Sequence, residues 1–382
     1  MLPALEIIIL AAAAFAVQGH TQTACVPAGE WTVPGGARVE AGEVLASAAR
    51  SSVVLLGESH DAADHHRWQL QTIAALAAQR PKIVLGFEMF PRRVQGALDR
   101  WVAGELSEEE FLRASEWSKS WGFEAAYYLP LFHFARINRI PMLALNVDRE
   151  FVRAVRDGGF ESVAPEKREG VSPAAPASEA YVEWLFTVFS QHGGKGHAAG
   201  RNDPAFRGFV AAELVWDSAM GQAIAGAIRR DPGVLVIGIM GGGHIRHGYG
   251  VPHQLRSLGV TQIASLLPWS ADEGCGEVSP GLATALFGLP AVHQTPQRPR
   301  LGISLEKTPA GVRIGSVVPG SVAEAAGLRA DDVLLEMAGS AVKESADVIA
   351  VVRSVAAGTW LPLKVRRKDE TVELVAKFRA GE

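Results

Sequence analysis

The sequence is 382 residues long, with 48% hydrophobic residues, 20% charged residues and a formal net charge of −4. This composition is that of a globular protein with enough apolar material for a core, and the length suggests two or three domains of roughly 100–200 residues each. Because no net positive charge attracts the chain to a polyanion, the composition argues against a nucleic-acid partner.

The N-terminal segment is typical of a signal peptide, with an unbroken apolar run from Ile7 to Val17 and small residues behind it. The run is too short to cross a bilayer, which takes about 20 helical residues. It departs from the usual pattern because no Lys or Arg precedes it and Glu6 lies at its edge. We predict that residues 1–25 form a signal or export segment.

The chain has two cysteines, Cys25 and Cys275, and no Cys-x-x-Cys motif. A zinc knuckle and a covalently attached c-type haem are therefore excluded. Cys25 follows Gln22-Thr23-Ala24 and is a candidate for lipidation, which would anchor the protein to a membrane, although a lipobox prefers Leu where Gln22 stands. The alternative is a disulfide between the two cysteines in an oxidising compartment.

Five short apolar runs, rich in β-branched residues, predict strands buried on both faces. Segments with helical spacing of apolar residues separate them, which implies a parallel sheet with right-handed crossovers. The predicted fold class is therefore α/β, a mainly parallel sheet flanked by helices. The predicted strands are Val53–Gly57, Ile83–Glu88, Met142–Asn146, Val234–Ile239 and Gln262–Leu266, and the predicted helices are Ala63–Gln79, Pro91–Ala103, Tyr128–Asn138 and Phe206–Arg230.

Polar side chains follow four of the predicted strands. Gly57-Glu58-Ser59-His60 ends the first, Glu88 the second and Asn146 the third, and the Val234 strand runs into Gly241-Gly242-Gly243-His244. Ligands of open α/β sheets bind outside the carboxyl ends of the strands. We therefore predict that Glu58, His60, Glu88 and His244 share one pocket.

The three glycines at positions 241–243 let the backbone approach a ligand closely or form an anion-binding nest. No Gly-Lys-Ser/Thr follows them, and no Gly-x-Gly-x-x-Gly opens a helix after the first strand. These absences from the sequence argue against a nucleotide cofactor.

The residue types of the predicted pocket suit two kinds of site. Imidazole and carboxylate groups bind divalent metal ions, for which His60, His244 and Glu88 are the candidate ligands. Histidine and tyrosine are also axial ligands of haem iron. The residue types alone leave both possibilities open.

A series of short motifs runs in consistent order from about residue 40 to residue 270. They are Leu56-Gly57-Glu58-Ser59-His60-Asp61 with His65-His66, Gly86-Phe87-Glu88-Met89-Phe90, Trp121-Gly122-Phe123 with Tyr128-x-Pro130, Ala144-Leu145-Asn146, Asp217-x-x-Met220, Gly241-Gly242-Gly243-His244-Ile245-Arg246 and Gly250-Val251-Pro252. On these motifs the chain resembles the ChaN-like haem-binding uptake family of the Tiki superfamily.

This resemblance implies a domain over residues 35–270 in an exported bacterial protein, often a lipoprotein, that serves haem or iron acquisition from the periplasm or the outer membrane. It implies haem bound between the protomers of a homodimer, with tyrosine or histidine near the iron. By motif position that tyrosine is Tyr128, although Tyr127 is its neighbour. The candidate haem-contacting residues are Tyr128, His60, His244, Glu58, Glu88, Asn146, Arg246 and His247.

The wider superfamily supplies an alternative function. It pairs two Gly-x-x-His motifs with glutamates, and some of its members resemble metal-dependent proteases or esterases. Both motifs are present here, from Gly57 to His60 and from Gly241 to His244. In a hydrolase, Glu58 or Glu88 would act as the general base and the histidines as metal ligands or acid–base partners.

Residues 156–205 form a weakly patterned insertion with an aromatic block from Tyr181 to Phe189 and two histidines, His192 and His197. Such a segment could cover a flat apolar ligand. The alternative is an ordinary surface loop with one amphipathic helix.

The C-terminal part changes in character after residues 271–299, which we predict to be a linker because they are rich in glycine, proline and polar residues. Residues 300–380 resemble a small, β-rich bacterial PDZ domain, beginning with Leu301-Gly302-Ile303-Ser304. The resemblance implies that the amides of Gly302, Ile303 and Ser304 hold a peptide C-terminus, which adds a strand to the sheet edge. Val348, on the helix from about Ser345 to Val355, either lines that groove or belongs to the core.

Two functions stand at this point. The preferred one is a haem-binding uptake protein whose PDZ domain binds the C-terminus of a peptide or partner protein. The other is a metal-dependent hydrolase whose PDZ domain presents the substrate.

Overall fold

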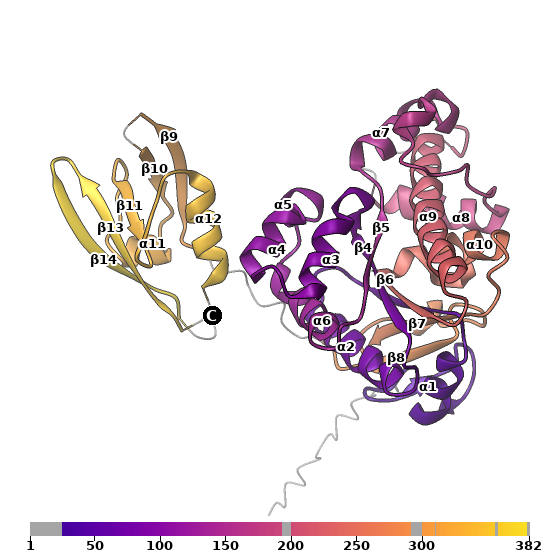
Figure 1. The fold of residues 1–382 in the computed structure, drawn as a ribbon. Helices are drawn as coiled ribbons and strands as arrows, with labels where there is room; N and C mark the ends of the chain where they lie inside the picture. Colours follow the sequence, from indigo (N-terminus) through magenta and orange to yellow (C-terminus); the bar gives the residue numbers. More distant parts are fainter. Residues whose placement is uncertain (1–24, 193–199, 292–299, 310, 356–357, 380–382) are drawn as a thin grey trace, which may run out of the picture. The chain divides into compact units, whose positions relative to one another are not determined.

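The computed structural model describes residues 25–192, 200–291, 300–309, 311–355 and 358–379, and Figure 1 shows its fold. The chain divides into two compact units, 1–291 and 292–382. Apart from Cys25, the predicted export segment lies outside the described residues, as does His197. Over the described ranges, no helix combines the length and the apolar character needed to cross a membrane.

The first unit is built on an eight-stranded sheet with the order β2-β1-β8-β7-β3-β6-β4-β5. Six neighbouring strands, from β8 to β5, are parallel, while β1 pairs antiparallel with β2 and β8. The strands are β1 (Trp31–Thr32), β2 (Arg38–Val39), β3 (Val53–Glu58), β4 (Ile83–Pro91), β5 (Met142–Asn146), β6 (Leu235–Gly241), β7 (Ile263–Ser270) and β8 (Ala285–Leu289).

Helices cover both faces of this sheet (Figure 1). One hydrophobic cluster joins Val54 and Leu56 of β3 to α1, α2, α3 and α6, and a second joins Val53 and Leu55 to α9 and α10. Successive residues of β3 therefore enter opposite cores, as expected for a strand buried on both faces. The helices are α1 (Ala41–Ala49), α2 (Ala63–Ala77), α3 (Gln95–Ala103), α4 (Glu108–Ala114), α5 (Trp117–Ser120), α6 (Ala125–Ile137), α7 (Arg149–Gly158), α8 (Glu179–His192), α9 (Pro204–Arg230) and α10 (Gly250–Ser257).

The predicted α/β class is confirmed, and all five predicted strands are present in the parallel part of the sheet. Four of them are longer than predicted at the carboxyl end, since β3 ends at Glu58 and β7 at Ser270. β4 continues to Pro91 through a register shift against β5 between Phe87 and Pro91, and β6 continues to Gly241. β-Bulges of this kind re-aim side chains, and Glu88 lies within this one.

The described part of the segment predicted to be a linker is not one, and residues 292–299 of that segment lie outside the described residues. Residues 271–291 belong to the first unit, because β8 joins the sheet between β7 and β1. The predicted domain limits of 35 and 270 are also too narrow, since β1 at Trp31–Thr32 pairs with β8. Glycine and proline content suggested a linker, but the apolar residues of Ala285–Leu289 form a buried strand.

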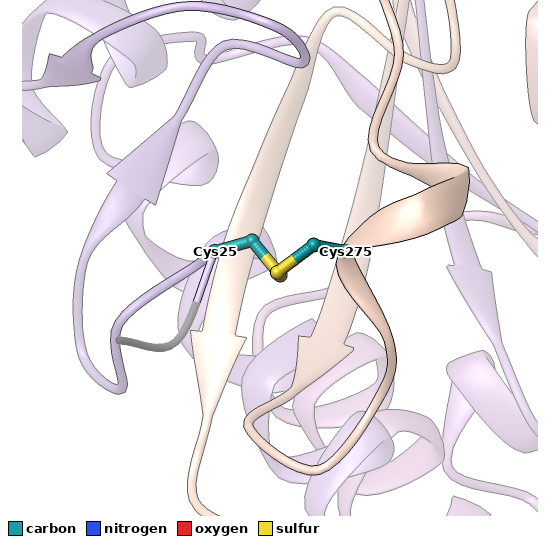
Figure 2. The surroundings of a disulfide bond; sticks show 2 residues. All are labelled: Cys25 and Cys275. Carbon is teal, nitrogen blue, oxygen red and sulfur yellow. A yellow bond between two sulfur atoms is a disulfide. The ribbon is translucent and has the colours of Figure 1, made fainter. Parts of the chain in front are cut away.

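A disulfide joins Cys25 to Cys275, 250 residues apart in the sequence, as Figure 2 shows. It ties the first described residue to the segment between β7 and β8. Of the two alternatives for Cys25, the structure therefore has the disulfide. A lipid anchor on Cys25 would need the same sulfur atom, so the predicted lipidation does not fit this structure.

The second unit is a six-stranded antiparallel sheet with the order β14-β13-β11-β10-β9 and β12 paired to β11. Its core includes Leu301, Val348 and Phe378. The elements are β9 (Ile303–Thr308), β10 (Gly311–Val317), α11 (Val322–Ala325), β11 (Val333–Met337), β12 (Ser340–Ala341), α12 (Ser345–Ser354), β13 (Trp360–Arg367) and β14 (Glu370–Lys377). The strand β9 lies at one edge of this sheet, and α12 contacts it.

Candidate functional site

A cavity of about 930 Å³ lies where the carboxyl ends of β3, β4, β5 and β6 meet. Its volume falls within the range of ~300–1,000 Å³ usual for small-molecule sites. The walls come from the sheet edge, the segment before α6, and the helices α7 and α9. The lining residues are His60, Glu88, Met89, Pro91, Arg93, Lys119, Ser120, Trp121, Phe123, Asn146, Val147, Asp148, Arg149, Glu150, Val152, Arg153, Arg156, Phe209, Ala212, Glu213, Trp216 and His244.

The predicted convergence of strand-end residues is present in the structure. The register of the sheet places Glu58 opposite Gly241 and Pro91 opposite Asn146. Of the predicted site residues, four line the cavity, namely His60, Glu88, Asn146 and His244. The side-chain amide of Asn146 donates to the backbone oxygen of Glu88 at 3.0 Å and so joins β5 to the bulged part of β4.

A chain of three side chains, here called the Glu58 arm, leads to one cavity histidine. The Tyr128 hydroxyl donates to Glu58 Oε1 at 2.6 Å, and the same oxygen lies 2.9 Å from His60 Nδ1. The amide of Gln69 donates to Glu58 Oε2 at 2.9 Å. The carboxylate is buried, while the side chain of His60 remains 29% exposed. With Nδ1 held by Glu58, the His60 nitrogen left for a ligand is Nε2.

The loop that carries His60 is fixed by the first turn of α2. The backbone amide of Ser59 donates to His65 Nδ1 at 2.8 Å. Burial, together with the neighbouring His66, lowers the pKa of His65 to about 4, so this imidazole stays neutral and accepts the bond. His66 Nε2 lies 3.2 Å from the backbone oxygen of His60.

A second chain of the same kind, here called the Asp217 arm, leads to the other cavity histidine. The Tyr181 hydroxyl donates to Asp217 Oδ2 at 2.7 Å, and Asp217 Oδ1 lies 2.8 Å from His244 Nδ1. Asp217 is fully buried in the middle of α9, and the His244 side chain is 12% exposed. Each arm therefore runs from a buried tyrosine through a buried carboxylate to a histidine in the cavity.

Glu88 lies between the two arms. Its Oε2 accepts the backbone N–H of Gly241 at 2.6 Å, and its Oε1 is 3.5 Å from His244 Nε2. A Cβ atom at position 241 would lie 3.3 Å from His60 Nε2 and 3.7 Å from Glu88 Oε2. The glycine predicted to allow close approach therefore does so here, by letting β6 pass directly beside His60 and Glu88.

The charges of this cluster are coupled. Burial opposes charge on all three groups, but the interactions among them outweigh it. The charge of Glu88 and the bond to Asp217 hold the pKa of His244 well above its usual value, and the bond to Glu58 with the charge of Glu88 raises the pKa of His60. His244 and His60 in turn lower the pKa of Glu88. The base of the cavity thus holds an ionised carboxylate beside a protonated His244.

Aromatic rings flank both histidines. Trp121 packs edge-on to His60 with ring centroids 4.7 Å apart, and Phe123 lies 5.1 Å away. Trp216 is perpendicular to His244 at 6.4 Å. Because Trp121, Phe123 and Trp216 also line the cavity, it has apolar walls beside its two imidazoles.

Tyr128 is not placed as the sequence suggested. It is fully buried, it does not line the cavity, and its hydroxyl is bonded to Glu58. Burial and the adjacent carboxylate also raise its pKa, which opposes the phenolate that binds iron. The structure therefore gives Tyr128 the role of holding Glu58. The Glu58 side chain likewise does not line the cavity, and it contacts the lining residue His60.

Arg246 and His247 also do not line the cavity, contrary to the prediction. Arg246 donates to Glu277 Oε2 at 2.7 Å, and the backbone N–H of His247 donates to Leu282 at 2.8 Å. The chain turns away after His244 through residues of 3-10 conformation, with His247 at a φ of +56°. The family resemblance makes both residues candidates for haem contact, but this turn takes them away from the cavity.

The metal-ion alternative is not supported by the geometry. Within the described ranges, no three His, Cys, Asp or Glu side chains are arranged so that they could hold a metal ion. His60, Glu88 and His244 are near one another, but each histidine is held by its own carboxylate through Nδ1, and Glu88 is bonded to a backbone amide.

Sequence reasoning missed Asp217, Tyr181 and Glu213 as parts of the site. Glu213 lines the cavity one helical turn before Asp217, and burial raises its pKa to about 7. The available signal was a pair of acidic residues with i, i+4 spacing inside the long apolar pattern of α9. In the sequence, Asp217 stands out only as part of the motif Asp217-x-x-Met220.

The predicted peptide-binding residues of the second unit lie at the start of the edge strand β9. Gly302 has a φ of +85°, and a Cβ there would lie 2.3 Å from Ser321 Cβ, so only glycine fits. Ile303 is partly buried, and Ser304 Oγ lies 2.8 Å from Ser316 Oγ. Val348 on α12 is a core residue with 2% exposure. Its alternative role as a groove residue stays a prediction.

Comparison with known families agrees with these features. The model of the family described as haem-binding uptake, Tiki superfamily, ChaN matches residues 44–255, more than half of the chain, and a PDZ domain model matches residues 299–377. The chain belongs to the ChaN-like haem-binding uptake family. A PDZ domain follows the ChaN-like domain in the sequence. No curated protein matches the chain.

A solved structure agrees with the fold of the ChaN-like domain. The ChaN protein of Campylobacter jejuni, solved with cofacial haem, has a TM-score of 0.51 and 15% identity over 67% of this chain and 95% of its own. A serine endoprotease from Yersinia pestis covers 22% of this chain and 30% of its own length at 21% identity, with a TM-score of 0.20. The HtrA3 PDZ domain bound to a phage-derived ligand covers 20% of this chain and 82% of its own at 20% identity, with a TM-score of 0.19.

Proposed function

We propose that this protein is an exported haem-uptake protein that binds haem in the cavity at the carboxyl edge of the first sheet. The observation that carries the proposal is that His60 and His244, each held by a carboxylate, line a cavity of about 930 Å³ with aromatic walls. Membership of the ChaN-like family supports it. So does the cofacial haem of the C. jejuni relative.

The residues present fit an iron porphyrin. Trp121, Phe123 and Trp216 offer faces and edges for a flat apolar ring system, and the histidines offer nitrogen ligands. The four tyrosines of the sequence are all described, and none lines the cavity. An imidazole is therefore the better candidate for the iron ligand in this protein.

His60 is the stronger candidate of the two histidines. Its Nε2 has no hydrogen-bond partner among the described residues, whereas His244 Nε2 lies 3.5 Å from Glu88 Oε1. The Glu58 carboxylate fixes the His60 ring and favours a proton on Nδ1. The lone pair of Nε2 is then free to bind iron. Haem, when bound, would supply an iron centre that can accept a nitrogen ligand. This chain would supply the imidazole and the aromatic walls.

A haem titration of the full chain tests the proposal. We expect the wild-type protein to shift the Soret band of added haem, and His60→Ala to lose the histidine-type spectrum. The matched control is His133→Ala, because His133 is an exposed histidine on α6 whose Nε2 lies 3.2 Å from Glu108. It should bind as the wild type does. A wild-type protein that leaves the haem spectrum unchanged would contradict the proposal.

For the second unit, we propose that the PDZ domain binds the C-terminus of a partner protein along β9. The edge position of β9 and its contact with α12 are the arrangement needed for strand addition. Binding of labelled C-terminal peptides should require a free terminal carboxylate. Equal binding of peptides with an amidated terminus would contradict this proposal.

A further inference from the structure

The basic side chains that line the cavity differ in how they are paired. Three have acidic partners. Arg93 is bonded to Asp148 and Glu116 at 2.7 Å each, Lys119 lies 3.3 Å from Glu116, and Arg156 lies 2.9 Å from Asp157. Carboxylates of the protein already pair with these three charges, so they are less free to bind a ligand than an unpaired cation.

Arg149 and Arg153 are different. Arg149 makes one long bond, from Nη2 to the backbone oxygen of Trp121 at 3.4 Å, and no described residue accepts a hydrogen bond from Arg153. A guanidinium has five N–H donors, so nearly all of the donors on these two residues remain available. Glu150 also lines the cavity from the same helix, but no ion pair joins it to either arginine in the described ranges.

The two arginines are suitably placed for a ligand with two anionic groups. They occupy positions i and i+4 of α7, so they project from one face of the helix about 6 Å apart along its axis. The bond from Arg149 to Trp121 places one guanidinium at the aromatic wall that packs on His60. A flat ligand at this wall would therefore have a cationic pair at one edge.

We propose that Arg149 and Arg153 form a carboxylate-recognition site, and that the cavity selects tetrapyrroles with two free carboxylates over their esters. This inference rests on the proposed haem-binding function and adds a substrate class to it. Guanidinium groups recognise carboxylates through paired, charge-assisted hydrogen bonds, which an ester cannot form with the same strength. The preference for diacids over diesters would therefore come from the carboxylates at the edge of the ligand and would not depend on its metal ion.

Equilibrium binding to the full chain tests this inference. The probes are iron protoporphyrin IX, its dimethyl ester and metal-free protoporphyrin IX, all in the same detergent buffer. We expect the wild type to bind the iron diacid about tenfold more tightly than the diester, and the double variant Arg149→Gln/Arg153→Gln to bind both within about twofold. Metal-free protoporphyrin IX should lose affinity in the double variant by a similar factor.

Arg113→Gln is the matched control, because Arg113 is an exposed arginine on α4 paired with Glu109 and far in sequence from α7. It should keep the wild-type preference. Equal binding of diacid and diester by the wild type would overturn the inference while leaving haem binding intact, and so would a preference that survives in the double variant. A wild type that binds none of the three probes would overturn the proposed function, and the inference with it.

Discussion

The Glu58 arm and the Asp217 arm use the same parts in different surroundings. In the Glu58 arm the carboxylate ends a strand and accepts from Tyr128 and Gln69 as well as contacting His60. In the Asp217 arm the carboxylate lies within a helix and its described partners are Tyr181 and His244. The first arm ends at the more exposed histidine, and the second at a histidine held by Glu88. Although a carboxylate holds Nδ1 of each histidine, Nε2 of His60 is available for a ligand and Nε2 of His244 lies beside Glu88.

The largest effect should come from removing the buried carboxylates. Glu58→Ala leaves three donors around an empty position, so we expect it to destabilise the first unit by about 3–5 kcal/mol. Asp217→Ala should cost less, because fewer groups lose a partner. Urea unfolding followed by tryptophan fluorescence measures both. If Asp217→Ala were the more damaging of the two, the difference drawn between the arms would be wrong.

The next largest effect should come from removing the two tyrosine hydroxyls, which should lower stability but leave haem binding unchanged. Tyr128→Phe and Tyr181→Phe each remove one hydroxyl bonded to a buried carboxylate, which should cost about 1.5–3 kcal/mol. Neither tyrosine lines the cavity, so haem affinity should change little in either variant. A stability loss in one variant and none in the other would break the similarity of the arms.

A smaller effect is the pH dependence of stability without haem. The pKa of His244 is raised well above its usual value and that of His60 is also raised. A raised folded-state pKa gives stability that is fully present below the unfolded pKa of about 6.5 and is lost as the pH rises through the folded value. The free energy of unfolding should therefore fall as the pH rises above about 6.5, and His244→Gln should flatten this slope more than His60→Gln. Equal slopes in both variants would show that the two imidazoles are equally coupled.

The sequence was enough to predict the parallel sheet and the meeting of His60, Glu88 and His244, because strand order matters little when all the strands end at one edge. It was not enough to predict which of these side chains line the cavity and which lie beneath them. Glu58 and Tyr128 lie in the same motifs as His60, yet they form the layer behind it. Asp217 was hidden because its partner Tyr181 lies 36 residues away on another helix. Such a pairing depends on how α8 packs against α9, which local pattern does not record.

The most direct test of the central claim compares haem spectra of His60→Ala and Tyr128→Phe side by side. The claim is that His60, held by Glu58 and Tyr128, presents Nε2 to the iron while Tyr128 does not reach the cavity. We predict that Tyr128→Phe keeps the wild-type Soret band and axial-ligand spectrum, and that His60→Ala loses them. A loss of the wild-type spectrum in Tyr128→Phe, with His60→Ala unchanged, would contradict the account.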